Sequence, residues 1–184
     1  MTWIIPLPLL ILTLAELDQL DPSTDTNKLL FRDSAITFPE NESLNTLIIG
    51  GEGYIGNVLC QRLLAARYNV FSYDNLIYRN NICVLNKIHY PNYHFIYGDM
   101  LVTHTLRPII KWADAVVLLA GLVGDPITKK YPKESALIND KGVKNIIDLC
   151  AKFNTNKFIF VSTCSNYGLV ESDELTNENH KLMP

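Results

Sequence analysis

The sequence predicts an α/β fold in which a doubly wound parallel sheet is covered by helices on both faces. Short apolar runs of strand length alternate with stretches of helical spacing from Asn45 onward. A cluster of four glycines separates the first run from the first helical stretch, and polar or glycine-containing motifs follow the later runs. Such alternation is typical of parallel strands that are joined by helical crossovers.

The elements follow one another in a regular order. A strand within residues 45–49 precedes a helix over residues 54–66, whose spacing places on one apolar stripe Ile55, Val58, Leu59, Leu63 and Ala66. A second strand over residues 70–73 leads into an irregular, asparagine-rich segment that ends at Lys87. Further strands are expected over residues 93–97, 115–119 and 157–161, with a short helix over residues 102–111. A long helix over residues 134–153 has an apolar face made of Leu137, Val143, Ile146, Ile147, Cys150 and Phe153. Right-handed crossovers arrange five such strands in the order 3-2-1-4-5.

The glycine cluster needs a physical explanation, because one glycine inside a regular element costs about 0.5–1 kcal/mol relative to alanine. It contains Gly51-x-Gly53-x-x-Gly56, the spacing of a dinucleotide-binding fingerprint, and also Gly50-x-x-Gly53-x-x-Gly56. Between a buried strand and a helix start, free amides and the positive end of the helix dipole face one point. This arrangement suits a diphosphate, and the alternative is a glycine-rich turn without a ligand.

An acidic residue follows the second strand at a separation typical of a ribose-binding carboxylate. Asp74 lies 18 residues beyond Gly56, close to the roughly 20 residues expected. A carboxylate accepts hydrogen bonds from both ribose hydroxyls and repels a 2′-phosphate, which favours NAD over NADP. The alternative is that Asp74 only caps the following turn. We therefore expect a Rossmann-like sheet with its ligand at the carboxyl ends of the strands.

Composition limits the remaining possibilities. A chain of 184 residues is long enough for one domain with a substantial core. The net charge of −3, without a long basic run, argues against a nucleic-acid partner. The four cysteines lack close pairing and the four histidines lack ligand spacing, so we expect reduced thiols, a cytoplasmic location and no metal site. Cys60 and Cys150 fall in apolar helical stripes, where buried thiols are expected.

Residues 1–44 do not fit the alternating pattern. We expect them to form an apolar arm and an acidic linker ahead of a domain over residues 45–184. The first basic residue is Lys28, so the positive n-region of a signal peptide is missing. The apolar stretch is also shorter than the roughly 20 residues of a membrane span. A packing arm, the tail of an upstream domain or a wrongly assigned start is favoured, with a signal or membrane anchor as the alternative.

Several motifs together resemble one protein family. GGEGYIG, YDNL, YGDM, LLAGLVGDP, INDKG and VSTCSNYG occur in the order and spacing of the extended short-chain dehydrogenase/reductases. Over 123 residues, from Thr46 to Gly168, the chain resembles the NAD-dependent epimerase/dehydratase branch, whose members modify nucleotide sugars. The resemblance implies a nucleotide-sugar substrate, a homodimer as a possible assembly, and hydride transfer between a sugar carbon and NAD. It also implies a tyrosine base and a lysine one helical turn away.

The resemblance implies which residues hold the adenosine and diphosphate parts of NAD. The glycines let the diphosphate approach, and two amides at the helix start contact it. Residues at the ends of the second and third strands meet the ribose and the adenine. The implied set is Gly50, Gly53, Tyr54, Ile55, Gly56, Asp74, Asn75, Asp99 and Met100, in which Asp99 takes the adenine amino group and Met100 covers the ring.

Other matches lie toward the nicotinamide and the sugar. Leu119, Ala120 and Gly121 correspond to the strip under the nicotinamide-side ribose. Asn139 corresponds to the asparagine of the central helix, and Thr163 to the residue that hydrogen-bonds the reacting sugar hydroxyl. The alternatives are a helix cap for Asp99, an ordinary polar helix residue for Asn139, and a backbone contact for Thr163.

The chain departs from the family pattern at the catalytic pair. None of its nine tyrosines has a lysine four residues later, so the Tyr-x-x-x-Lys pair is absent. In the family the tyrosine base lies about two dozen residues past the Thr163 position, and 21 residues follow Thr163 here. We therefore expect the cofactor-binding half of an enzyme, with a sheet that is incomplete at its C-terminal side and no turnover by this chain alone.

One more motif bears on the type of reaction. Thr163-Cys164-Ser165 stands at the strand end where, by the resemblance, sugar 4,6-dehydratases carry Thr-Asp-Glu. The two carboxyls of that motif drive the elimination of water. Epimerase or simple dehydrogenase chemistry is therefore favoured over dehydration. Two other interpretations stay open, namely a non-catalytic NAD-binding module and an unstable gene remnant with exposed apolar surface.

Overall fold

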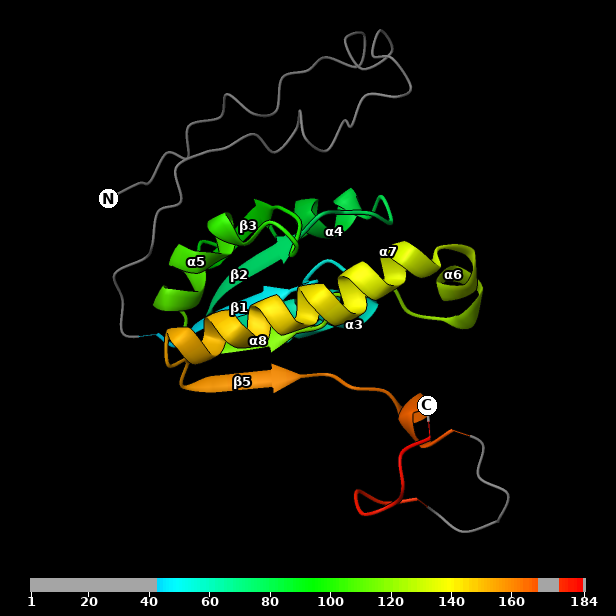
Figure 1. Ribbon diagram of the computed structural model, residues 1–184. Helices are drawn as coiled ribbons and strands as arrows, with labels where there is room; N and C mark the ends of the chain where they lie inside the picture. The colour runs from blue at the N-terminus through cyan, green and yellow to red at the C-terminus, as the bar shows by residue number, and fades with distance from the viewer. Residues whose placement is uncertain (1–42, 169–175, 184) are drawn as a thin grey trace, which may run out of the picture.

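A computed structural model describes residues 43–168 and 176–183, so residues 1–42 of the expected N-terminal arm and linker lie outside the described residues. Five parallel strands form one sheet in the order β3-β2-β1-β4-β5, which confirms the predicted fold class and strand order (Figure 1). The strands are β1 (Asn45–Ile49), β2 (Asn69–Asp74), β3 (Tyr93–Tyr97), β4 (Ala115–Leu118) and β5 (Lys157–Phe160).

Helices connect these strands and differ from the prediction in several segments, among them Asp125–Lys130, for which no helix was expected. The α-helices are α3 (Tyr54–Ala65), α4 (Asn81–Leu85), α5 (Thr103–Trp112), α6 (Asp125–Lys130), α7 (Pro132–Ala136) and α8 (Val143–Lys152). Helix α4 lies in the segment that was expected to be irregular. A π-helical segment, Leu137–Gly142, divides the expected long helix into α7 and α8, and a 3-10 turn, Cys164–Tyr167, follows β5.

The central strands are buried on both faces of the sheet, because alternate residues of a strand point to opposite sides, whereas the edge strand β5 is mostly exposed. Leu47 and Ile49 of β1 belong to a cluster that includes residues of α5 and α8. Ile48, between them, belongs to a second cluster that includes residues of α3 and α4. Helices α5 and α8 thus cover one face, with α3 on the other (Figure 1).

The apolar stripe predicted for the first helix is correct only for Leu59 and Leu63, which are half-buried against the second cluster. Ile55 and Val58 are each 55% exposed, whereas the buried residues of α3 are Gly56, Cys60 and Leu64. The cause is close packing of the helix start on the glycine loop, since a Cβ atom at Gly56 would lie 2.2 Å from the carbonyl oxygen of Gly50. That approach turns every fourth position from Gly56 onward toward the sheet.

The face predicted for the long helix is correct only in part. Ile146 and Cys150 of α8 are buried, but Leu137 is 44% exposed and Ile147 is 43% exposed. A π-helical turn closes its hydrogen bonds over five residues rather than four. Leu137, at the start of this segment, is therefore rotated away from the face that α8 buries.

The cysteines are all free in the described structure. Cys60 and Cys150 are buried, as predicted, whereas Cys83 is half-buried and Cys164 is exposed. No helix within residues 43–168 and 176–183 combines the length and the apolar character that crossing a membrane requires.

Candidate cofactor site

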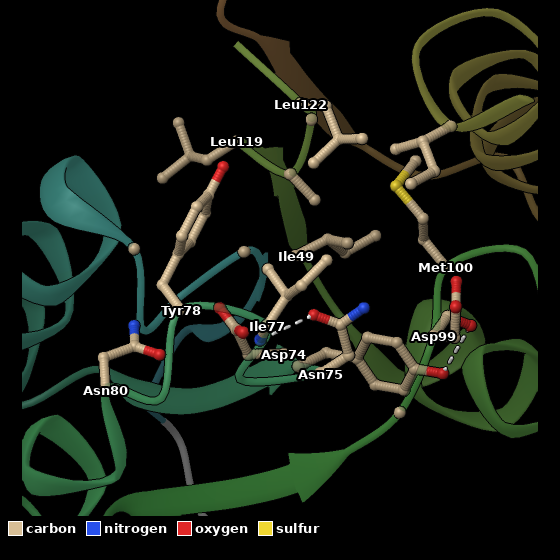
Figure 2. Close-up of a pocket in the computed structure, with 17 residues that line it drawn as sticks. Ile49, Asp74, Asn75, Ile77, Tyr78, Asn80, Asp99, Met100, Leu119 and Leu122 are labelled. Atoms are coloured by element: carbon tan, nitrogen blue, oxygen red, sulfur yellow. Dashed lines mark hydrogen bonds between the residues drawn. The ribbon is translucent and has the colours of Figure 1, made fainter. Parts of the chain in front are cut away.

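A pocket lies at the carboxyl ends of the central strands, and Figure 2 shows the side chains that line it. Four segments converge there: the glycine loop after β1 and the chain just after β2, β3 and β4. The structure brings together in its lining the predicted residues Gly50, Gly53, Asp74, Asn75, Asp99, Met100, Leu119, Ala120 and Gly121. This is where ligands bind in open parallel sheets.

The glycine loop fits tightly between its neighbours. Gly50 has a φ of +86°, and a Cβ atom there would lie 2.6 Å from the amide nitrogen of Ala120. Its N–H donates to the carbonyl of Tyr73 at 2.8 Å, which joins the loop to the end of β2. Glycine is therefore required at this position by its backbone conformation and by the closeness of β4.

The start of helix α3 is open to a ligand. Gly53 is the N-cap residue, and no side chain caps the helix there. The amides of the first turn have no partner inside the helix, and two of them belong to Tyr54 and Ile55. Tyr54, Ile55 and Gly56 are not among the residues that line the pocket, and Tyr54 is 96% exposed. The first turn of α3 thus offers backbone donors and the positive end of a helix dipole.

Asp74 is held by two backbone amides. Its Oδ2 accepts from the N–H of Glu52 at 2.9 Å, and its Oδ1 accepts from the N–H of Leu76 at 2.8 Å. Burial raises the pKa of Asp74, whereas these two hydrogen bonds lower it. Each carboxylate oxygen keeps acceptor capacity for a further donor, and Figure 2 shows Asp74 among the side chains of the pocket.

The end of β3 supplies a second carboxylate. Asp99 accepts a hydrogen bond from the N–H of Leu101 at its Oδ1, 2.9 Å away. The hydroxyl of Tyr73 donates to the backbone carbonyl of Asp99 at 3.0 Å, which fixes this turn against β2 (Figure 2). Met100, 5% exposed, lies next to Asp99 in the lining.

Besides Tyr54, Ile55 and Gly56, two further predicted residues, Asn139 and Thr163, lie outside the pocket lining. The Asn139 side chain, on the π-helical segment, accepts from the N–H of Leu122 at 2.8 Å and donates to the carbonyl of the same residue at 2.7 Å. Asn139 thus holds the segment after β4 in place. The Oγ1 of Thr163 accepts from the N–H of Ser165 at 3.2 Å and caps the 3-10 turn after β5.

Sequence reasoning missed other residues around the pocket. Its lining also includes Ile77, Tyr78, Asn80, Leu122 and Ile138. The first three follow Asp74 in a segment without periodicity, so no pattern marked them. Beneath the loop lies a buried ion pair between Glu52 and Lys87. Glu52 was visible as a charged residue inside a glycine cluster, but Lys87 carried no signal because α4 was not predicted.

No group of three or more histidine, cysteine, aspartate or glutamate side chains is placed to hold a metal ion in the part of the chain that the structure describes. The convergent groups at the pocket are instead backbone amides, two carboxylates, the side-chain amides of Asn75 and Asn80, and apolar and aromatic side chains. This set of groups suits a ligand with hydroxyls, an anionic portion and flat apolar rings.

Comparison with known proteins gives consistent matches. The model of the NAD dependent epimerase/dehydratase family matches residues 46–184. A UDP-glucose 4-epimerase of Rhizobium meliloti (strain 1021) is 31% identical over 144 residues, which are 76% of this chain and 41% of that protein. The chain therefore spans less than half the length of this relative.

Solved structures give the same picture. The UDP-Glc/GlcNAc 4-epimerase from Campylobacter jejuni is 25% identical with a TM-score of 0.71, and the match covers 77% of this chain and 44% of that one. A UDP-glucuronic acid 4-epimerase from Bacillus cereus, solved with UDP-glucuronic acid and NAD, is 26% identical with a TM-score of 0.70. That match covers 77% of this chain and 46% of the other.

Proposed function

Because this chain belongs to the NAD-dependent epimerase/dehydratase family, we propose that it binds NAD and forms the cofactor-binding part of a nucleotide-sugar epimerase. The observation that carries the proposal is the pocket in which an uncapped helix start meets Asp74 and Asp99 at neighbouring strand ends. NAD would supply the redox chemistry, taking a hydride from a sugar carbon and returning it. The protein contributes binding, orientation and electrostatics.

The residues fit NAD on three counts. The loop between Gly50 and Gly56 brings backbone amides, not side chains, to the point where a diphosphate would lie. Asp74 has one free acceptor position on each oxygen for the two hydroxyls of a ribose. The Oδ1 atom of Asn80, which lines the same pocket, is buried and has no hydrogen-bond partner among the described residues. A ligand hydroxyl would satisfy it.

We assign the remaining parts of the cofactor by position. Asn75 lies next to Asp74, the proposed ribose-binding carboxylate. Asp99 would accept a hydrogen bond from the adenine amino group, and Met100 would cover the adenine ring. The strip Leu119–Ala120–Gly121 would lie under the nicotinamide-side ribose. Asn139 would hold that strip through its two hydrogen bonds to Leu122.

The type of reaction is inferred from the end of β5. Thr163 would bond a hydroxyl of the sugar, and the residues after it are Cys164 and Ser165. Neither provides the acid that water elimination needs at this place. Epimerisation or simple dehydrogenation is therefore favoured over dehydration. The sequence contains no Tyr-x-x-x-Lys pair, so we infer that this chain alone does not turn over a sugar nucleotide.

Two measurements on the purified chain test the proposal. Calorimetric titration should show NAD binding, with weaker binding of NADP because Asp74 repels a 2′-phosphate. A chromatographic assay with UDP-glucose and NAD should show no UDP-galactose. Absence of NAD binding by folded protein would contradict the first part, and steady epimerisation would contradict the second.

A non-catalytic NAD-binding module would have the same pocket and would lack only the sugar substrate. Titration of UDP-glucose into the NAD-loaded chain addresses this alternative. Saturable binding of UDP-glucose favours the interpretation as part of an epimerase, whereas NAD binding without UDP-glucose binding favours the non-catalytic module.

A further inference from the structure

A buried ion pair lies directly beneath the glycine loop. Glu52, the middle residue of Gly51-Glu52-Gly53, turns its side chain into the core rather than toward the pocket. Lys87 follows helix α4, and its Nζ lies 2.8 Å from Oε2 of Glu52. Both side chains are 0% exposed, so neither charge is solvated by bulk water.

The charged atoms of the pair have protein partners from several elements. The hydroxyls of Ser72 on β2 and Tyr93 on β3 both donate to Oε1 of Glu52, at 2.6 Å and 2.8 Å. The ammonium of Lys87 also donates to Oδ1 of Asn57 on α3, at 2.5 Å. It lies 5.6 Å from the centre of the Tyr93 ring. One carboxylate and one ammonium thus join three elements below the loop.

The backbone of Glu52 connects the same network to the pocket. Its N–H donates to Oδ2 of Asp74 at 2.9 Å, and its carbonyl accepts from the side chain of Asn80. Both Asp74 and Asn80 line the pocket. Any shift of Glu52 would therefore move the glycine loop together with the side chains of Asp74 and Asn80.

Stability alone is a weak reason for this arrangement. Taking two charges out of water is expensive, and replacing a buried ion pair by apolar residues is often neutral or stabilising. Removing one partner, in contrast, leaves an uncompensated buried charge and is costly. An ion pair that is retained at this place is better explained by the geometry that it enforces.

We propose that the Glu52–Lys87 ion pair positions the cofactor site: it fixes the glycine loop, whose Glu52 amide holds Asp74, and Lys87 offsets part of the charge that Glu52 places beside that carboxylate. Glu52 and Lys87 are positioning residues and do not touch the ligand. The inference rests on the proposed NAD binding, because Asp74 acts here as the acceptor for the ribose hydroxyls.

The charges around Asp74 predict how its ionisation responds to the pair. Among its charged neighbours, Glu52 raises the pKa of Asp74 and Lys87 lowers it, with Glu52 the larger of the two. Cys60 on α3 and Tyr93 on β3 also face Glu52 and stay neutral, because burial raises the pKa of Cys60 to about 12 and raises that of Tyr93. Asp99 lines the same pocket and is unchanged in every variant below.

The pH at which NAD affinity is lost should shift in opposite directions when Lys87 or Glu52 is removed. NAD binding needs ionised Asp74 and is lost as the pH falls through the pKa of Asp74. Removing Lys87 alone raises that pKa, so the acid loss of affinity moves to higher pH. Removing both charges also removes the larger effect of Glu52, which raises the pKa of Asp74. The pH at which NAD affinity is lost therefore returns to the wild-type value or falls below it.

The test is calorimetric NAD titration of Lys87→Gln, Glu52→Gln and the double variant, from acidic to slightly alkaline pH. At neutral pH, K87Q should bind NAD at least about tenfold more weakly, since a buried carboxylate loses its partner. The double variant should regain most of that affinity, because two neutral amides can hydrogen-bond to each other. Lys111→Gln, a change at an exposed lysine of α5, is the matched control and should behave as wild type.

The pH profile separates positioning from a merely structural role. K87Q should lose affinity at higher pH than wild type, and the double variant should not. If K87Q fails to fold, as judged by circular dichroism, E52Q takes its place and should lose affinity at lower pH. Variants with lowered melting temperatures but unchanged NAD affinity and pH profile would overturn the inference. No NAD binding by the wild-type chain would instead overturn the proposed function, and this inference with it.

Discussion

Asp74 shows how a single residue can serve the fold and the ligand together. Its two oxygens each accept one backbone amide, from the glycine loop on one side and from the following turn on the other. A carboxylate is suited to this position because both of its oxygens are acceptors. An asparagine would place an amide donor opposite one of these backbone donors.

The first prediction concerns this position. Asp74→Asn should weaken NAD binding by about tenfold or more, because hydrogen bonds to a charged group are worth roughly 1.5–3 kcal/mol. It should also narrow the preference for NAD over NADP, since the charge that repels a 2′-phosphate is gone. Calorimetric titration with both dinucleotides measures the two effects. Asp148→Asn, at an exposed position of α8, is the control, and equal NAD affinity in the two variants would contradict the role given to Asp74.

The second prediction concerns His94 on β3. Its ring stacks on Phe71 with centroids 4.5 Å apart, and its Nε2 is buried without a partner among the described residues. Burial lowers the pKa of His94, so the unfolded chain takes up a proton below about pH 6.5 that the folded chain resists. The free energy of unfolding should therefore fall as the pH drops below this range.

Replacing the ring tests this linkage. His94→Phe keeps an aromatic ring beside Phe71 and removes the titration, so it should lose less stability than wild type between neutral and mildly acidic pH. The pH slope of the free energy of unfolding should differ between the two proteins by at most about 1.4 kcal/mol per pH unit. Urea unfolding at two pH values measures it. His104→Phe, at an exposed position of α5, should leave the pH dependence as in wild type, and identical slopes for all three proteins would refute the assignment to His94.

At the scale of elements, apolar periodicity predicted the existence of the larger helices better than the faces that they bury. Helix α3 was expected to bury Val58, yet it buries Cys60, because contact between Gly56 and the loop sets the rotation of the helix. That contact depends on a missing side chain, which a count of apolar residues does not register. The five-residue helix α4 was missed for a different reason, since it is too short to show a helical period.

The third prediction compares two glycines of the loop. A Cβ atom at Gly56 would lie 2.2 Å from the carbonyl oxygen of Gly50 and 2.8 Å from the backbone of Gly51, whereas one at Gly53 would lie 3.3 Å from the nearest atom, also the Gly50 oxygen. Gly56→Ala should therefore destabilise the fold by roughly 1–3 kcal/mol, as expected for overpacking, and lower NAD affinity as well. Gly53→Ala should cost less stability but still hinder the diphosphate.

Chemical unfolding and NAD titration of the same two variants provide the check. The expected pattern is a large loss of stability only in G56A and a loss of NAD affinity in both. Equal stability losses would show that the close approach of α3 to the loop does not decide the packing. Full NAD affinity in G53A would show that the diphosphate does not lie over this glycine.

At the scale of the whole molecule, the strand order and the edge of the sheet at which the pocket lies could both be predicted from the sequence. Alternation of strands and helices permits few arrangements once crossovers are right-handed, and parallel strands bring Gly50, Asp74 and Asp99 to one edge of the sheet. Which side chains then turn into the pocket could not be predicted. Glu52 lies within the fingerprint and points away from the pocket, while Tyr78 and Asn80 reach it from an aperiodic segment. These orientations depend on tertiary contacts between residues distant in sequence.

The last prediction follows from that convergence. NAD, as proposed, would contact four segments that are separate in the chain and adjacent only in the folded sheet, so it should bind the folded state alone. Binding of this kind stabilises the fold by about 2.7 kcal/mol at a ligand concentration one hundred times the Kd. For a chain of this length, 1 kcal/mol corresponds to roughly 2–4 °C in melting temperature. Saturating NAD should therefore raise the Tm by about 5–10 °C, and NADP at the same concentration by less. Thermal unfolding followed by circular dichroism measures the shift, with D74N as the variant in which it should shrink. A Tm that does not change with NAD, in a protein whose spectrum shows helices and strands, would mean that the four segments do not form one cofactor site.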